Sequence, residues 1–224
     1  MLFALRQPET LLGLVLGFAV SLIALAAATR ALERAHRHAT PFWHPQSWLD
    51  PYSAVAALLG GVGWPAKADG RRGFGRSRDR HLVTVAAVSF VVPAALGAAA
   101  LAGYAALAGR GALALMDSMS VLHGDGFVQL IAPTFAEKVL IGFGVESLAV
   151  GLLTLVPIPP LPTGVAVWTI LPRTEGARRM AYRLLEEYWG VVVLLVLFIL
   201  PLAGEGPLLL LLVTSVVDGI AHAF

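Results

Sequence analysis

One ionisable side chain stands in the middle of an apolar run, and it is the first place where this sequence could do chemistry. Glu146 and Ser147 interrupt the run at 139–156. A carboxylate is costly to leave against lipid, so an ionisable residue at such a depth is a functional candidate by default. Ser147 and Thr154 are seven residues apart and share one helical face, with Glu146 beside it. This polar stripe either lines a binding cleft or bonds polar groups within a helix bundle.

Histidines form the second group with chemical potential. His36 and His38 have a spacing that can hold a metal ion, and His44 follows closely. Arginines stand among them, however, and a hydrated segment beside an anionic membrane surface is the reading we favour. His123 and Asp125 lie in a glycine-rich loop and could ligate a cation, but a turn stabilised by Asp125 explains them more simply. We therefore expect no metal site.

A proline-rich segment follows the apolar run that carries Glu146. Four prolines occur within residues 157–162, and each removes a backbone donor and crowds the preceding turn, so a regular helix cannot continue here. At membrane depth, such broken backbone must be shielded by protein or face a wet cavity. We predict that residues 157–164 mark the working site of the molecule.

The amino-acid sequence of this segment resembles a motif of the site-2 protease family of intramembrane zinc metalloproteases. Members carry Asn-x-x-Pro-x-Pro-x-x-Asp-Gly here; the Asp is the third zinc ligand, and the prolines shape the cleft in which a substrate helix unwinds. Pro157 and Pro159 match this pattern. Thr154 stands in place of the Asn and Pro162 in place of the Asp, so the resemblance implies the frame of the site without its ligand.

The first apolar run corresponds to the helix that carries His-Glu-x-x-His in the resembled family. There, two His one turn apart bind zinc and the Glu polarises the attacking water. Ser21, Leu22 and Leu25 occupy those three places. The run at 11–29 contains no His, Asp or Glu in any register. The resemblance therefore implies that the zinc site is lost and that no cofactor is bound.

Two further loops resemble the family in the expected order. Pro45, Asp50 and Pro51 match its Asn-Pro-x-x-His-x-Asp-Pro-x-Gly segment, and Gly63 and Trp64 echo a Gly-Trp element that borders the substrate cleft. The simpler reading of this region is an interfacial loop with tryptophan anchors. The resemblance implies a binding cleft lined by nine residues: Glu146, Ser147, Thr154, Pro157, Pro159, Pro160, Gly164, Asp50 and Trp64.

Composition indicates a membrane protein. Of the 224 residues, 58% are hydrophobic and 13% are charged, and the mean hydropathy of +0.79 is too high for a soluble domain. No Cys is present, which excludes disulfides, thiolate zinc sites and cysteine nucleophiles. Basic residues lie beside the expected spans rather than on a folded basic face, so nucleic acid is excluded as a partner.

The hydropathy pattern predicts a single all-α domain, 1–224, with about five transmembrane helices. The expected spans are 11–29, 82–108, 139–156, 189–202 and 207–220, the last two forming a hairpin. A cleaved signal peptide is the rival reading of the first span, and we favour retention. The basic loop 66–81 is cytoplasmic by the positive-inside rule, and 173–188 reads as an amphipathic surface helix. The amino terminus is then outside and the carboxyl terminus cytoplasmic.

The sequence thus predicts a catalytically inactive, site-2 protease-like protein of the inner (plasma) membrane. Its retained cleft would bind a transmembrane helix or a partner subunit, with membrane lipid as its other partner. Two alternatives stay open. One is an active metalloprotease with substitute ligands drawn from His36, His38, His44, Asp50 or Glu146. The other is an accessory subunit of a larger membrane complex without a functional cleft.

Overall fold

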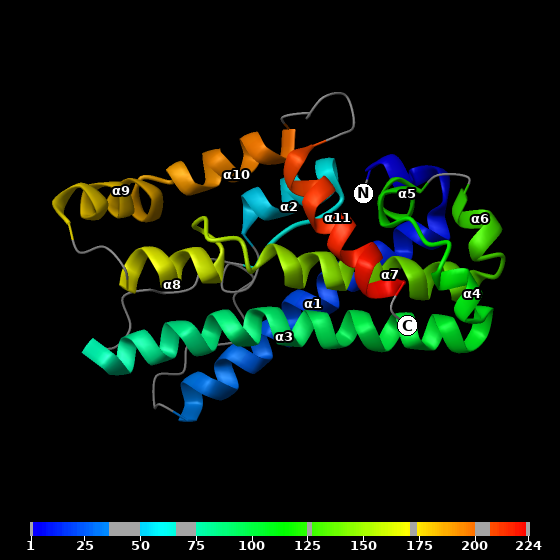
Figure 1. The fold of residues 1–224 in the computed structure, drawn as a ribbon, viewed down its shortest axis with the longest axis horizontal. Helices are drawn as coiled ribbons and strands as arrows, with labels where there is room; N and C mark the ends of the chain where they lie inside the picture. Colours follow the sequence, from blue (N-terminus) through cyan, green and yellow to red (C-terminus); the bar gives the residue numbers. More distant parts are fainter. Residues whose placement is uncertain are drawn as a thin grey trace.

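The computed structural model describes residues 2–35, 50–65, 75–124, 127–170, 174–199 and 207–222, and the regular elements within these ranges are helices joined by turns (Figure 1). The histidines His36, His38 and His44, the residue Asp125 and most of the basic loop 66–81 lie outside them. The elements in chain order are η1 (Leu2–Arg6), α1 (Pro8–Ala35), α2 (Pro51–Gly60), α3 (Gly75–Ala108), α4 (Arg110–Leu113), α5 (Ser118–His123), α6 (Phe127–Ile131), α7 (Phe135–Leu153), α8 (Pro162–Ile170), α9 (Glu175–Glu186), α10 (Trp189–Ile199) and α11 (Leu208–Ala221).

Three long helices form the centre of the fold, with α1 and α3 both packed along α7. Gly13 of α1 lies against the Val139 carbonyl, and Gly17, one turn later, lies against Phe143 and Glu146, so α1 and α7 run in the same direction. Helix α3 runs in the opposite direction. Its Gly97 lies beside Gly144, whereas Phe90, which comes earlier in α3, lies beside Gly151, which comes later in α7. Up-down-up packing of this kind is typical of a membrane bundle.

Glycines, which have no side chain, allow the backbones of these helices to approach closely. A Cβ added at Gly13 would collide with the Val139 carbonyl oxygen, and one at Gly97 would lie 2.8 Å from the Gly144 carbonyl oxygen. Neither position has room for alanine. In lipid, close backbone approach supplies the packing that water would otherwise drive by the hydrophobic effect.

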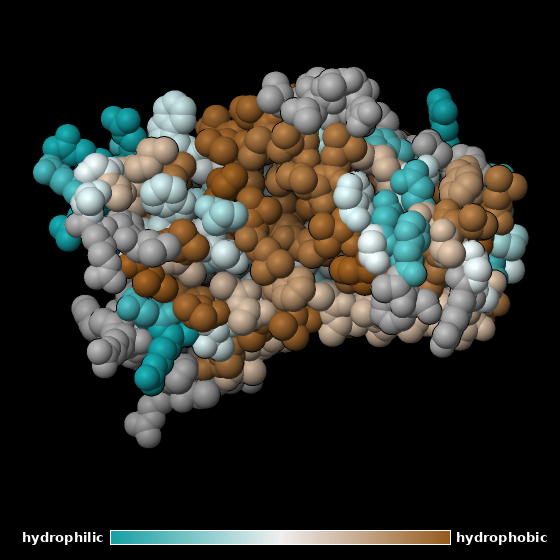
Figure 2. All heavy atoms as spheres, viewed as in Figure 1, coloured by the Kyte–Doolittle hydropathy of each residue, from teal (hydrophilic) through white to brown (hydrophobic). Residues whose placement is uncertain are grey.

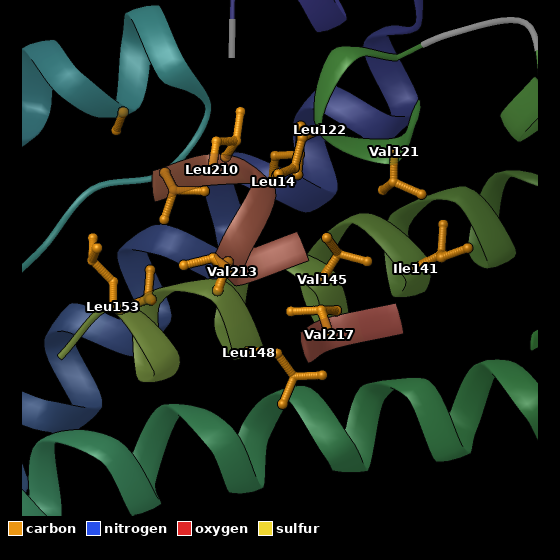
Figure 3. Packing of buried hydrophobic residues seen from close by; sticks show 14 of the residues in the cluster. Leu14, Val121, Leu122, Ile141, Val145, Leu148, Leu153, Leu210, Val213 and Val217 are labelled. Carbon is orange, nitrogen blue, oxygen red and sulfur yellow. The ribbon is translucent and has the colours of Figure 1, made fainter. Parts of the chain in front are cut away.

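The hydrophobic core is completed by helices from both ends of the chain. Figure 3 shows Leu14 of α1, Leu122 of α5, Val145 of α7 and Val213 of α11 meeting in one cluster. All four are buried. Because the last helix contributes directly to this cluster, the chain from α1 to α11 folds as one packed body.

The carboxyl end of α11 is fixed to the connection between α3 and α7. The backbone N–H of Ser118 donates to Asp218 Oδ1 at 2.8 Å, and His222 Nε2 lies 3.2 Å from the Met116 carbonyl oxygen. Helices α10 and α11 therefore follow one another along the bundle and do not form the expected hairpin. The carboxyl end lies at the same end of the bundle as η1, away from the start of α3 (Figure 1). The side of the membrane on which the carboxyl terminus lies stays a prediction.

Within the described ranges, two helices are long and apolar enough to cross a membrane, namely α1 over Pro8–Leu32 and α3 over Asp79–Ala108. Helix α7 has 19 residues at the third predicted span, whereas α10 and α11 have 11 and 14 residues at the last two. At 1.5 Å per residue, each of these last two is shorter than a hydrocarbon core of about 30 Å. The number of spans stays a prediction.

The face seen in Figure 2 is apolar in its middle and more polar toward both ends of the long axis. Large exposed apolar side chains occur on α1, α10 and α11: Leu12, Val15, Leu16, Ile23, Val192, Val193, Val196, Ile199, Leu212 and Val216. Helix α9 lies at one end, as expected of 173–188, but its apolar residues Ala181 and Leu184 are buried against the protein and not left free. The polar face of α9 points to solvent.

Candidate functional site

The buried polar residues of the candidate site gather where α1 crosses α7. Glu146 and Ser147 are both fully buried, and Ser147 Oγ lies 3.5 Å from the Gly17 carbonyl oxygen. Ser21 is also fully buried, one helical turn beyond Gly17 on the same face of α1. Neither carboxylate oxygen of Glu146 nor the Ser21 hydroxyl has a hydrogen-bond partner in the described part of the chain. The first group of predicted residues thus surrounds one turn of α1.

Thr154 does not extend this polar stripe. Its hydroxyl donates to the Gly151 carbonyl at 2.6 Å, within the last turn of α7, and its side chain is buried. A Thr hydroxyl that bonds its own helix in this way has used its donor, and only its lone pairs stay available to a ligand. The prediction that Thr154 shares a functional face with Ser147 is therefore not supported by its hydrogen bonding.

The proline-rich segment ends α7 and turns the chain into α8. Pro159, Pro160 and Pro162 are buried and the Pro159–Pro160 peptide bond is cis, whereas Pro157 is exposed. The Trp168 indole donates to the Pro157 carbonyl at 3.1 Å. Gly164 lies so close to the carbonyl carbon of Ile158 that any side chain there would collide with it. The segment is thus a compact turn, held by α8 folding back over it.

A second structured element comes from residues 50–65. Asp50 caps α2 by accepting the N–H of Tyr52 at 3.0 Å, and its other oxygen accepts the Trp64 indole N–H at 3.0 Å. Ser53 Oγ donates to the Trp64 carbonyl at 2.5 Å and accepts the Trp64 N–H at 2.6 Å. Trp64 is fully buried. It is therefore a core residue, and the simpler reading of Trp64 as a headgroup anchor is wrong.

Helix α10 lies on the walls that were expected to form the cleft. Gly190, in its first turn, is in direct contact with the Pro159 carbonyl. The ring centroids of Phe198 and Trp64 are 6.0 Å apart. Both Gly190 and Phe198 are buried. The structure therefore brings Trp64 and the proline segment together through α10, and Gly63, next to Trp64, lies against Phe18 of α1.

The positions that correspond to catalytic groups are all buried in the fold. Leu22 and Leu25 of α1 are buried, as is the neighbouring Ser21. Pro162 is the first residue of α8, which packs on α3. No group of three His, Cys, Asp or Glu side chains converges within the described ranges. Of the substitute ligands considered, Asp50 is engaged with Trp64 and Glu146 lies between α1 and α7.

Sequence reasoning missed three residues that organise these sites. Gly17 supplies the carbonyl beside Ser147, Ser53 holds both backbone groups of Trp64, and Phe198 packs on the Trp64 ring. The Gly13–Gly17 spacing was a signal for close helix approach that could have been used. Ser53 and Phe198 carry no such local signal.

Comparison with protein-family models, curated proteins and solved structures finds no match.

Replacing Ser53 with alanine tests whether the 50–65 element depends on this hydroxyl. The substitution leaves the buried N–H and carbonyl of Trp64 without their partner, which costs about 1–3 kcal/mol for each unsatisfied buried group. We expect a clear fall in the thermal midpoint of the detergent-purified protein. The matched control is Ser215→Ala, because Ser215 is exposed and only bonds back to Leu211 in its own helix. Equal midpoints for the two variants would contradict this role.

Proposed function

We propose that this chain is a non-hydrolytic membrane protein with a site-2 protease-like core that binds a transmembrane helix of a partner protein. The observation that carries the membrane part is the distribution of apolar surface. Only 39% and 33% of the most apolar windows of α1 and α3 are buried within the fold. A core helix of a soluble protein would bury most of such a window. The rest of these windows suits contact with lipid.

The core proposed to resemble the family consists of α1, α3 and α7 with the turn at 157–162. Its support is that a helix without ligands, α1, packs parallel to the helix that leads into the Pro-x-Pro turn. Hydrolysis by this mechanism needs a metal to activate water and a base to take its proton. Ser21, Leu22, Leu25 and Pro162 provide neither group.

The proposal that the protein binds a helix rests on the contacts that α10 makes with the residues expected to line the cleft. Trp64 and Pro159 hold an apolar helix, α10, by ring contact and by direct backbone packing at Gly190. The outer face of α10 stays exposed through Val192, Val196 and Ile199. Because α10 has 11 residues, it cannot cover the bilayer alone. A partner helix that packs beside it would complete the surface, and we assign the partner site to this outer face.

The proposed orientation follows from the basic residues. The basic segment 66–81 follows α2 in the chain and includes the first residues of α3, and it is cytoplasmic by the positive-inside rule. Helices α8 and α9 then lie on the cytoplasmic side, and η1 lies outside. The carboxyl end of α11 lies outside as well, since it is bonded to Met116 and Ser118. The host membrane is proposed to be the inner (plasma) membrane.

Elemental analysis tests the non-hydrolytic assignment. We expect protein purified without chelator to contain well below one equivalent of zinc, because the four positions that resemble the zinc site and its base carry no ligand. We also expect no change in thermal midpoint on adding a strong chelator. One tightly held equivalent of zinc, lost together with stability on chelation, would contradict the assignment and favour a protease with substitute ligands.

Photo-crosslinking in native membranes tests the partner site. A photoreactive amino acid at Val196 on the outer face of α10 is expected to give one discrete adduct with another membrane protein. The matched control is the same amino acid at Val91, which is exposed on α3 at 57% compared with 50% for Val196. Discrete adducts from Val91 but not from Val196 would place the partner elsewhere, and their absence at both sites would refute the proposal.

Reporter fusion tests the orientation. Alkaline phosphatase fused after Phe224 is expected to be active, because it matures only outside the cytoplasm, and a fluorescent protein at the same place is expected to be dark. The control is the same pair of reporters inserted in the basic loop, where the opposite pattern is expected. A fluorescent carboxyl-terminal fusion would show that α11 ends on the cytoplasmic side.

A further inference from the structure

The carboxyl group of Glu146 is left without any partner in the interior of the described structure. Its exposed fraction is 0%, and neither Oε1 nor Oε2 makes a hydrogen bond. The Ser21 hydroxyl is in the same condition. Buried polar groups in folded proteins are nearly always bonded, and each exception calls for an explanation such as a bound ion or water. Two exceptions from facing helices are therefore informative.

Helix geometry places these two groups around the same turn of α1. A Cβ at Gly17 would lie 3.1 Å from Cβ of Glu146, so the α7 residue is in direct contact with Gly17. Ser21 is one turn further along α1, and a helical side chain leans back over the preceding turn, which here contains Gly17. Ser147 Oγ lies 3.5 Å from the Gly17 carbonyl oxygen, at the limit of a hydrogen bond. Glu146, Ser147 and Ser21 are thus placed around the same turn of α1, which contains Gly17.

The chemistry of this group favours a cation. All its ligating atoms are oxygens, and one of them belongs to a carboxylate, as hard cations require. Protonation of Glu146 would remove its charge, but it would leave the carbonyl oxygen of the carboxyl group and the Ser21 hydroxyl without a hydrogen bond. A water molecule would supply hydrogen bonds but would leave a buried negative charge, which is expensive at this depth. A monovalent cation supplies ligands and neutralises the single charge.

We propose that Glu146, Ser21, Ser147 and the Gly17 carbonyl form a sodium-ion site between α1 and α7. We choose sodium over potassium because the backbones of the two helices are already in contact at Gly13 and Gly17, which favours the ion of smaller radius. The site goes beyond the proposed partner binding and does not depend on it. It resembles transporter sites in combining side-chain and backbone oxygens within the membrane.

Ion-dependent stability and direct binding test this proposal on the full chain in detergent. We expect the thermal midpoint of the native protein to rise with NaCl relative to choline chloride at equal ionic strength, and to rise less with KCl. Equilibrium dialysis with radioactive sodium is expected to give one ion per chain. The variant Glu146→Gln is expected to lose the sodium response, and Ser21→Ala to weaken sodium affinity by about tenfold.

Matched controls separate a missing ligand from general damage. Ser89→Ala removes a buried hydroxyl that bonds only to Val85 in its own helix, and Glu186→Gln removes an exposed carboxylate. Both are expected to keep the sodium response. Identical midpoints in sodium and choline, with no bound radioactive sodium in the native protein, would overturn the proposal even if Glu146→Gln fails to fold. That result would leave the photo-crosslinking test of the partner site unaffected.

Discussion

The contact between the backbones of α1 and α7 is the constraint on which the rest of this structure depends. At Gly13 and Gly17 the two helices touch without intervening side chains, and this fixes both their separation and their parallel direction. The contact aligns Ser21 with Ser147 and buries Glu146 between the helices. It also sets where α7 ends, and with it the position of the proline turn. A polar group can persist at such depth because the helices exclude lipid from it.

A second level of organisation depends on the short helices that cover this core. Trp64 is held by Asp50 and Ser53 and meets Phe198 of α10, while Gly190 rests on Pro159. The walls that were expected to surround a bound helix are therefore in contact with a helix of the same chain. Our proposal that the protein recognises a helix by packing and does not cleave it fits this arrangement, because α8 and α10 cover the turn at 157–162.

The sequence predicted the long helices well and their ends less well. Apolar runs located α1, α3 and α7, yet α3 begins at Gly75, seven residues before the expected start at 82, because the charged residues of the basic loop also take up helix. The direction of α11 was mispredicted. Glycines at 204 and 206 favour a tight reversal locally, but the bond of Asp218 to Ser118 joins residues 100 apart in the chain, and no local pattern encodes it. Likewise, the pattern marked Glu146 as unusual without indicating that Gly17 would be its neighbour.

The place of α11 in the core has a consequence for how the protein is made. Val213 and Val217 pack against residues of α1, α5 and α7, but they leave the ribosome last. Synthesis proceeds at about 5–20 residues per second, so Leu14 and Val145 stay uncovered for several seconds, in the bilayer if the chain is inserted as we propose. Lipid or the insertion machinery must shield them during this interval. Truncation before Leu208 would make that temporary state permanent, and quality-control proteases of the membrane would have a defined surface to recognise.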